Sequence, residues 1–253
     1  MKLLDQKVAI ITGGSMGIGG ATAELFAQHG AKVVITGRHR EALDEMAAKI
    51  RTDGGEVHAI VADAASLEDC KRVFQETLEV YGDIDILVNN AGTSSLYAID
   101  TTTDEEWEKV VALNLSGVFH YCREAVTYML EKNKGNIVNI SSMNGVRPVS
   151  GCSYSVTKRA VNALSESIAM RCAGTPVRCN TVCPGGTDTP LMQSAFVNGE
   201  IDPNILDGMQ KRIDLTLPNT KPIDQAWAIL FLASDYARAI TGAELHVDHG
   251  SFL

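Results

Sequence analysis

The sequence predicts one α/β domain, a doubly wound parallel sheet of about seven strands with helices on both faces. Three observations predict this fold. Short aliphatic runs without polar alternation recur along the chain, as expected for parallel strands buried on both sides. Stretches of helical length separate these runs, so strand and helix alternate. No Pro/Ser-rich linker, repeat or charge block divides the 253 residues, so we expect a single domain over 1–253.

The first unit contains the most informative turn. A buried strand over 8–11 runs into a glycine-rich turn over 12–19, a helix that ends near residue 29 and a strand over 32–36. Glycines let the backbone approach a ligand, and the helix N-terminus presents unpaired N–H groups to an anion such as a pyrophosphate. The glycine spacing differs from the common G-x-G-x-x-G pattern, however, and a tight connection would also explain it.

The middle of the chain continues the alternation. Ser66 and Asp69 have the spacing of a capping box and predict a helix that ends near Tyr81. Thr103 and Glu106 predict a second capped helix, which runs to about residue 133. The other predicted elements are strands over 57–62, 84–88, 137–140 and 177–182 and a helix over 153–172.

The regular pattern stops between residue 184 and about residue 222, where prolines and glycines are dense. So long a connection is typical of a lid or binding loop, and we expect the substrate loop there. A helix over 224–234 and a strand over 244–247 close the chain. Ligands of such sheets bind outside the carboxyl ends of the strands. The residues that follow strands should therefore gather at one edge, namely Thr12, Asp63, Asn89, Ser142 and Pro184.

Composition excludes several classes of protein. The net charge of -9 argues against nucleic-acid binding, which needs clustered Lys and Arg. No apolar run approaches the roughly 18 residues of a membrane span. Asp5 and Lys7 interrupt the segment that a signal peptide would need. We therefore expect a cytoplasmic protein with neither nucleic acid nor membrane as partner.

The cysteines and histidines predict no metal site. The six cysteines form no C-x-x-C pair and none has a histidine at zinc-site spacing, so we interpret them as small buried hydrophobes. His246 and His249 flank Asp248 and could suggest a ligand set. A strand end is the interpretation that we adopt.

Tyr154 and Lys158 lie four residues apart on a predicted helix and share one face. A neighbouring ammonium favours the phenolate and should lower the pKa of Tyr154. Ser142, just after a strand, could hydrogen-bond the same ligand oxygen. Hydride transfer to a carbonyl leaves a negative oxygen, which needs such a proton donor and a stabilising group.

The same spacing occurs a second time and serves as a control. Tyr128 and Lys132 are four residues apart, and Ser116 precedes Tyr128 as Ser142 precedes Tyr154. That second set belongs to one continuous helical pattern, so Ser116 should lie about three turns from Tyr128. Only the set at a strand end predicts a site.

Together these motifs resemble the short-chain dehydrogenase/reductase family over essentially the full length. The matching pieces are Thr12-Gly13-x-x-x-Gly17-x-Gly19, Asn89-Asn90-Ala91-Gly92, Asn114, Ile140-Ser141-Ser142, Tyr154-x-x-x-Lys158, Asn180 and Pro184-Gly185-x-x-x-Thr189. The resemblance implies a Rossmann-like fold and an NAD(P)-dependent oxidoreductase that acts on CH–OH groups.

The resemblance also implies roles for single residues. Tyr154 would be the general acid in reduction and the base in oxidation, and Ser142 would orient the carbonyl. Lys158 would bind the nicotinamide ribose and tune Tyr154, while Asn114 would hold a water in a proton relay.

The cofactor contacts are likewise implied, with Asp63 at the adenine, Asn90 at the ribose and Thr189 at the carboxamide. The full expected set is Gly13, Ser15, Met16, Gly17, Ile18, Gly19, Arg38, Asp63, Asn90, Tyr154, Lys158, Pro184, Gly185, Thr187 and Thr189.

Two departures from the family pattern are visible. Counting the usual interval back from Tyr154 reaches Ser141, although Ser142-x-x-Gly145 matches the serine context of the family and favours Ser142. The last strand ends in Val247-Asp248-His249-Gly250, where the family commonly has Val-Asp-Gly-Gly.

The second strand favours NADP(H) over NAD(H). Gly37 occupies the position of the acid that would accept the ribose hydroxyls of NAD, and Arg38 could pair with a 2′-phosphate. Two features weigh against this preference. Arg38 and Arg40 could simply be solvated at a helix start, and Met16 stands where many NADP-preferring members carry a basic residue.

The family layout places a substrate between Tyr154 and the loop after Pro184. The expected lining is Ser94, Ser142, Asn144, Val146, Cys152, Tyr154, Gly186 and Met192. No cation is clearly placed to bind an acid, since Arg147 is more typical of a surface position. A neutral ketone or secondary alcohol is therefore the expected substrate.

The helices before residue 133 and over 153–172 carry apolar residues on more than one side, which predicts a homodimer or homotetramer. Several alternatives remain open. They are a cofactor-binding regulatory or scaffold protein without turnover, an NAD-dependent alcohol, hydroxysteroid or polyol dehydrogenase, a 3-oxoacyl reductase, and an epimerase or dehydratase.

Overall fold

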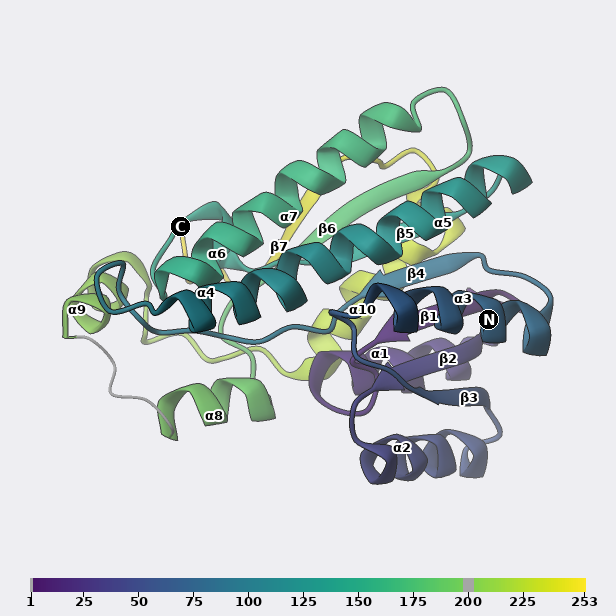
Figure 1. The fold of residues 1–253 in the computed structure, drawn as a ribbon, viewed down its shortest axis with the longest axis horizontal. Helices are drawn as coiled ribbons and strands as arrows, with labels where there is room; N and C mark the ends of the chain where they lie inside the picture. The colour runs from purple at the N-terminus through teal and green to yellow at the C-terminus, as the bar shows by residue number, and fades with distance from the viewer. Residues whose placement is uncertain (1, 198–202) are drawn as a thin grey trace.

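The computed structural model describes residues 2–197 and 203–253. Its centre is a seven-stranded sheet with the order β3-β2-β1-β4-β5-β6-β7, and every strand pair is parallel (Figure 1). The strands are β1 (Val8–Thr12), β2 (Lys32–Gly37), β3 (Glu56–Val61), β4 (Ile86–Asn89), β5 (Asn136–Ile140), β6 (Arg178–Pro184) and β7 (Glu244–Val247). The chain runs outward from β1 to β3 and then returns to β4, which confirms the predicted doubly wound sheet.

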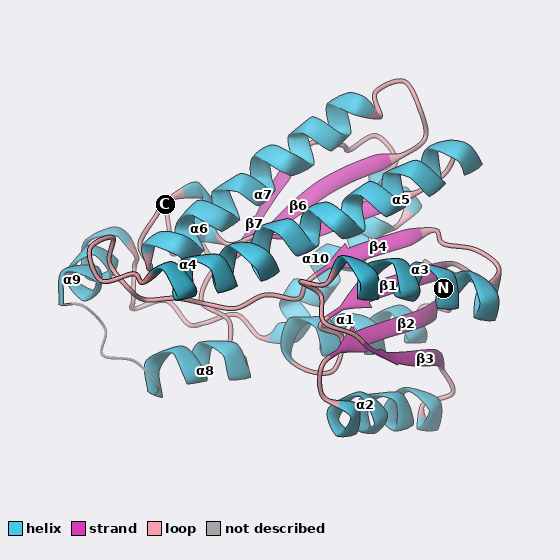
Figure 2. Ribbon diagram, in the orientation of Figure 1, coloured by secondary structure: helices cyan, strands magenta, loops and turns pink. Residues whose placement is uncertain are grey.

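Helices cover both faces of the sheet (Figure 2). One face packs against α1 (Gly17–Gln28), α2 (Arg40–Thr52) and α10 (Pro222–Ala233). The other face packs against α3 (Leu67–Tyr81), α5 (Val118–Lys132) and α7 (Cys152–Arg171). The remaining helical elements are α4 (Asp104–Val111), α6 (Met143–Val146), α8 (Pro190–Val197), α9 (Pro203–Arg212) and two short segments, η1 (Ala112–Gly117) and η2 (Asp235–Ala237).

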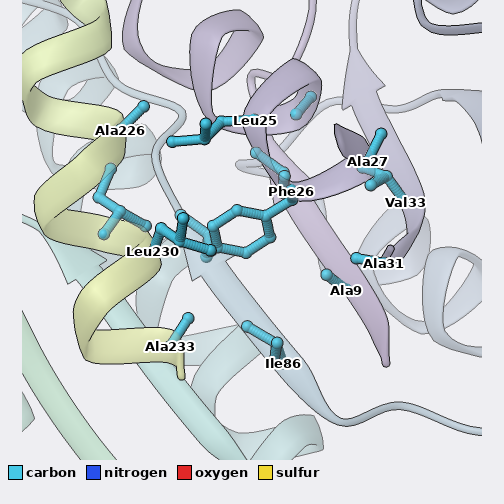
Figure 3. Packing of buried hydrophobic residues seen from close by; sticks show 14 of the residues in the cluster. Ala9, Leu25, Phe26, Ala27, Ala31, Val33, Ile86, Ala226, Leu230 and Ala233 are labelled. Atoms are coloured by element: carbon cyan, nitrogen blue, oxygen red, sulfur yellow. The ribbon is translucent and has the colours of Figure 1, made fainter. Parts of the chain in front are cut away.

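The core beneath α1 and α10 fixes the position of the glycine turn. Phe26 on α1 is fully buried and packs with Leu25 towards Ala226 and Leu230 of α10, above Ile86 of β4 (Figure 3). Truncating such a phenylalanine to alanine typically costs about 3–5 kcal/mol. This packing holds α1 rigidly behind the turn that precedes it.

Two predicted helix starts are confirmed. The Ser66 side chain accepts a hydrogen bond from the Asp69 backbone N–H, and Thr103 accepts one from Glu106. The Asp69 carboxylate does not complete a capping box, because it accepts instead from the backbone N–H of Asp63 at 2.8 Å. It therefore ties the start of α3 to the end of β3.

The long helix expected from Thr103 to about residue 133 is interrupted. Between α4 and α5 the backbone forms the π-helical segment η1, which contains the fully buried Asn114. Single π turns inside α-helices are frequent at functional sites. The spacing of apolar residues alone does not reveal such a segment, because α4, η1 and α5 follow one another as one continuous helical pattern.

The region 184–222 is not the irregular loop that we expected. It contains α8 and α9, which begin at Pro190 and Pro203, and α10 begins at Pro222 rather than at residue 224. Proline fits the first turn of a helix, so these prolines start helices instead of breaking them. The part of the expected substrate loop over 198–202 lies outside the described residues. Helices α8 and α9 lie beyond the carboxyl ends of the strands (Figure 1).

Within the described residues, no helix combines the length and the apolar character needed to cross a membrane.

Candidate active site

The glycine turn after β1 depends on residues without side chains. Gly13 and Gly17 adopt positive φ angles of 64° and 56°, which favour glycine. A Cβ atom at Gly19 would collide with the carbonyl oxygen of Gly13. The Asn90 side chain donates to the carbonyl oxygens of Thr12 at 3.0 Å and Gly13 at 3.1 Å. These two hydrogen bonds from Asn90 fix the conformation of the turn.

These hydrogen bonds give Asn90, which we expected at the ribose, a structural role in the glycine turn. Its amide nitrogen is engaged by the turn, and Thr12 Oγ1 accepts from the backbone N–H groups of Asn90 at 2.9 Å and Ala91 at 3.0 Å. The sequence predicted Thr12 at a strand end and in the glycine motif, but not its hydrogen bonds to the segment after β4. Its hydrogen-bond partners, Asn90 and Ala91, follow the neighbouring strand β4, and sequence spacing gives no sign of this contact.

The N-terminus of α1 is open to an anion. Met16 caps this helix without a side-chain hydrogen bond, and the Gly20 N–H is the first to bond back within it, to Met16 O at 2.9 Å. The N–H groups of Gly17, Ile18 and Gly19 thus remain available, and no acidic residue lies in the first turn. Backbone donors at the positive end of a helix fit the pyrophosphate of a dinucleotide.

Thr189 comes close to the glycine turn from β6. A Cβ placed on Gly17 would lie 3.5 Å from Thr189 Cγ2, so the segment after β6 covers the first turn of α1. Thr189 Oγ1 accepts from the Met192 N–H at 3.2 Å and starts α8. Thr187 is placed differently, because its hydroxyl is buried against that of Thr220 at 2.8 Å.

The end of β2 lies beside the turn as well. The Gly14 N–H donates to Thr36 O at 3.0 Å, and a Cβ on Gly37 would lie 3.6 Å from Ser15 Oγ. Arg38 is exposed and forms no ion pair with any residue that the structure describes, whereas Arg40 lies 3.9 Å from Asp44. The Arg38 guanidinium is therefore free to bind an anion near the glycine turn.

Asp63 follows β3, the strand next to β2. Its Oδ1 accepts from the Ala65 N–H at 2.9 Å, which turns the chain towards α3. The partly buried carboxylate thus stands at the same sheet edge as Gly37, because Ala62 N–H donates to Gly37 O at 2.9 Å.

Ser142 and Tyr154 meet at the carboxyl end of β5. The Ser142 hydroxyl acts on the Tyr154 phenol and lowers its pKa, although the two side chains come from separate elements. Ser142 Oγ also accepts from Asn144, from the backbone N–H at 3.1 Å and from Nδ2 at 3.3 Å. With its lone pairs so occupied, the Ser142 hydroxyl donates its proton to the site. Ser141, the alternative serine, points away and donates to Lys158 O at 2.9 Å.

Lys158 lies one helical turn from Tyr154 on α7. Its ammonium stands 5.7 Å from the centre of the Tyr154 ring and donates to Ile140 O at 2.9 Å. Burial lowers the pKa of Lys158 to about 8. A Cβ on Gly92 would lie 3.5 Å from Nζ, so the backbone after β4 closes over the lysine.

The expected lowering of the tyrosine pKa is not seen in this structure. Burial raises the pKa of Tyr154, and the neighbouring Ser142 hydroxyl lowers it by less. The physical reason is that the Lys158 ammonium is directed at Ile140 O and stands beside the ring. The expectation considered the charge of the lysine and left out the desolvation of the phenol.

Asn114 in η1 holds the segment after β4 from below. Its Oδ1 accepts from the Thr93 N–H at 2.8 Å, and its Nδ2 donates to Thr93 O at 2.9 Å. Nδ2 also lies 3.4 Å from Thr157 Oγ1 on α7. Asn114 therefore connects the strand end, the π segment and the helix of Tyr154.

The second tyrosine and lysine pair is far from this constellation in structure and in role. Tyr128 donates to Asp83 Oδ1 at 2.9 Å, and Lys132 stands 5.5 Å from the ring of Tyr128. Asp83 belongs to the loop before β4, at the opposite edge of the sheet from Ser142. The distinction drawn from strand ends is consistent with this arrangement.

The expected substrate residues come from three segments. Asn144 Oδ1 accepts from the Val149 N–H at 3.1 Å, which folds the segment after α6 over Ser142. Gly151, next to Cys152, packs against the backbone of Ser95, next to Ser94. Gly186 lies against Asn219, whose Nδ2 is 3.8 Å from Met192 Sδ. Asn219 is a neighbour of the site that sequence spacing gave no signal for.

The chain matches known proteins along most of its length. The model of the short chain dehydrogenase family matches residues 7–198. The NADP-dependent (R)-specific alcohol dehydrogenase of Lentilactobacillus kefiri is 39% identical over 253 residues, 98% of this chain and 97% of the relative. The 3beta-hydroxysteroid dehydrogenase of Mediterraneibacter gnavus is 35% identical over 266 residues, 99% of this chain and 96% of the relative.

Two further comparisons agree. The 3-oxoacyl-[acyl-carrier-protein] reductase of Thermotoga maritima is 34% identical over 248 residues, covering 98% of each chain. The crystal structure of gox2181 matches with a TM-score of 0.88 and 32% sequence identity, covering 98% of this chain and 96% of that one. With its parallel sheet, glycine turn and tyrosine–lysine helix, this chain belongs to the short-chain dehydrogenase family of oxidoreductases that act on CH–OH groups.

Proposed function

We propose that this protein reduces a neutral ketone to a secondary alcohol, and catalyses the reverse oxidation, with NADP(H) as its cofactor. The observation that carries the proposal is the meeting of Ser142 and Tyr154 at the carboxyl end of β5, with Lys158 one helical turn along α7 from Tyr154. The nicotinamide supplies or accepts the hydride. The chain's own residues bind the cofactor, orient the carbonyl and move the proton.

Tyr154 is the proton donor in this proposal. Reduction adds a hydride to the carbonyl carbon, and the oxygen then takes one proton from the phenol. The raised pKa of Tyr154 keeps the phenol protonated at neutral pH, as a donor must be. Ser142 donates a second hydrogen bond to the same oxygen, which holds the carbonyl in place and stabilises the developing charge.

Lys158 and Asn114 complete the site in this proposal. The ammonium stabilises the phenolate left by proton transfer and binds the ribose, while its bond to Ile140 O fixes its direction. Asn114, through Thr93, positions the Gly92 backbone over Lys158. We propose that Asn114 also takes part in holding a relay water behind the lysine.

The preference for NADP(H) rests on the end of β2. Gly37 carries no acid that would repel a 2′-phosphate, and Arg38 is exposed and unpaired within the described part of the chain. Arginine and lysine form strong charge-assisted hydrogen bonds with phosphate, and arginine does so through a planar fork of donors. The Lentilactobacillus kefiri relative is named as NADP-dependent.

The preference for a neutral substrate rests on the residues that are expected to line the substrate site. Asn144, Cys152 and Met192 are uncharged, and Arg147 is exposed. A charged keto acid would lose its hydration without gaining a cationic partner. A 3-oxoacyl thioester also presents a neutral ketone, so reductases of that class share this chemistry.

We further propose that the protein is a homodimer or homotetramer. On α7, Val156, Ala163 and Met170 repeat every seven residues and are exposed, while Phe119 is exposed on the neighbouring α5. Apolar residues in one stripe of a helix favour a helix partner.

The test is a screen of neutral ketones and keto acids, in which NADPH or NADH consumption is followed by absorbance. We expect turnover of neutral ketones with NADPH, and an NADPH dissociation constant at least tenfold below that of NADH by fluorescence titration. Turnover of keto acids alone would overturn the substrate class. Equal dissociation constants would overturn the cofactor preference.

A further inference from the structure

Three metal-binding side chains meet on the last two strands of the sheet. The ligand atoms of Cys183 on β6 and of Glu244 and His246 on β7 all lie within 4.8 Å of one another. The strand register explains the meeting, because Cys183 pairs with His246 and Thr181 pairs with Glu244. Cys183 is far from Glu244 and His246 in sequence, so spacing gave no signal that the three would meet.

The alternation of β7 places both of its ligands on one face. Leu245 and Val247 pack against the core under α1 and α10, so Glu244 and His246 face the opposite side. Cys183 on β6 is fully buried, Glu244 is partly buried and His246 is exposed. The cluster therefore opens from a buried thiol to solvent.

We propose that Cys183, Glu244 and His246 bind a zinc ion, with water as the fourth ligand. Thiolate, carboxylate and imidazole are the three side-chain types that zinc takes in proteins. One thiolate and one carboxylate balance the two charges of the ion, so the bound site adds no net charge beneath α7. The proposal is independent of the substrate and cofactor assigned above.

Two buried oxygen atoms beside the cluster support a ligand there. Asn162 Oδ1 and Thr181 Oγ1 have no hydrogen-bond partner within the described residues, although their side chains are only 2% and 1% exposed. The Asn162 amide nitrogen lies 3.9 Å from Cys183 Sγ, and Thr181 is opposite Glu244. Unpaired buried acceptors are rare, and a water on the metal would donate to them.

The geometry needs only a small adjustment. In a tetrahedral site with Zn–N near 2.0 Å and Zn–S near 2.3 Å, ligand atoms are about 3.3–3.5 Å apart. A spacing of up to 4.8 Å therefore has to shrink by up to about 1.5 Å. The His246 side chain is exposed, so it can rotate towards the other two ligands without movement of the strand backbones. Bound metal would tie the edge strand β7 to β6.

Cobalt is the probe that reports the thiolate directly. Titrating the purified full-length protein with Co²⁺ should give one equivalent of a near-ultraviolet thiolate-to-cobalt absorption band, displaced by Zn²⁺. Cys183→Ser should remove the band, and His246→Gln should weaken Co²⁺ binding at least tenfold. Cys152→Ser removes a partly exposed thiol outside the cluster, and His249→Asn removes the imidazole three residues after His246; both variants should leave the band intact.

Thermal unfolding keeps the test decisive if the buried Cys183 variant fails to fold. Zn²⁺ should raise the Tm of the wild-type protein and of His249→Asn, because a ligand that binds the native state stabilises it. It should not raise the Tm of His246→Gln, whose change is on the surface. No cobalt band in the wild type, a band lost in Cys152→Ser, or equal Tm shifts in wild type and His246→Gln would overturn the proposal.

Discussion

Stability and chemistry make opposite demands at Lys158. Its side chain is only 5% exposed, and burial lowers its pKa to about 8, well below the ordinary 10.5. The ammonium donates to a backbone carbonyl, Ile140 O, and among the described residues no carboxylate forms an ion pair with it. A buried charge without a counter-ion destabilises the fold, and such residues are retained where function requires them.

We therefore predict that Lys158→Met makes the protein more stable and inactive. Below pH 8 the lysine is charged in both states, and a pKa difference of about 2.5 units at 1.36 kcal/mol each corresponds to about 3 kcal/mol. Losing the bond to Ile140 O offsets about 1 kcal/mol of this. Urea unfolding at equal protein concentration should show a gain of about 2 kcal/mol at pH 7.

The gain should shrink as the pH rises from 8 towards 10.5. In that range the folded wild type has lost the proton while the unfolded chain retains it, so wild-type stability rises with pH. A variant that is less stable than the wild type at pH 7 would show that the Lys158 hydrogen bond outweighs its desolvation.

Gly37 controls the charge presented to the cofactor. A Cβ at this position would make ordinary contacts, 3.6 Å from Leu43 Cδ2 and from Ser15 Oγ, and its φ angle is not positive. The site can therefore accept a larger residue without strain. The absence of an acid here is a chemical choice and not a steric requirement.

The change Gly37→Asp should reverse the cofactor preference. A carboxylate would accept the ribose hydroxyls of NAD and repel a 2′-phosphate. We expect the ratio of kcat/KM for NADPH to that for NADH to fall at least a hundredfold. Arg40→Ala is the control, because Arg40 is near Asp44 and should leave the ratio within about twofold. An unchanged ratio in Gly37→Asp would place the 2′ position elsewhere.

At the scale of secondary-structure elements, hydrophobic pattern and caps predict what they physically determine. Ser66 and Thr103 start α3 and α4 as expected, because a cap is a local hydrogen bond. The π segment η1 was not predicted, since it depends on Asn114 being held by Thr93, far away in sequence. Helices α8 and α9 were missed because their starting prolines resemble loop signals.

The same reasoning explains how much of the site could be predicted. Local spacing and a strand end predicted that Tyr154, Lys158 and Ser142 lie together, and the structure brings these three side chains together. Ser142 rather than Ser141 acts on Tyr154, because Ser141 donates to Lys158 O instead. Asn219 and the hydrogen bonds of Thr12 to the segment after β4 were not predicted, because they depend on contacts between segments that only the folded chain brings together.

At the scale of the whole molecule, one sheet separates two cores, and the outer side of α7 carries an exposed apolar stripe. The stripe of Val156, Ala163 and Met170 on α7 lies outside the core that the other side of this helix joins. Exposed apolar stripes of this kind favour association of subunits. The candidate site lies at the carboxyl edge of the sheet, where the segments after β1 to β6 come together.

We predict a dimer or tetramer in solution. Light scattering at micromolar concentration should give a mass of two or four chains. Val156→Glu with Met170→Glu should reduce it by placing carboxylates in the stripe, whereas Val80→Glu, an exposed position on α3, should not. A monomer in the wild type would refute the prediction.

The central claim is that Tyr154 gives up the proton, and the most direct measurement compares Tyr154→Phe with Tyr128→Phe. Each variant removes one hydroxyl from a tyrosine four residues before a lysine, but only Tyr154 lies beside Ser142. We predict that Tyr154→Phe lowers kcat for ketone reduction by at least a thousandfold and leaves the NADPH dissociation constant within about threefold. Tyr128→Phe should keep full kcat. Substantial turnover by Tyr154→Phe would contradict the account.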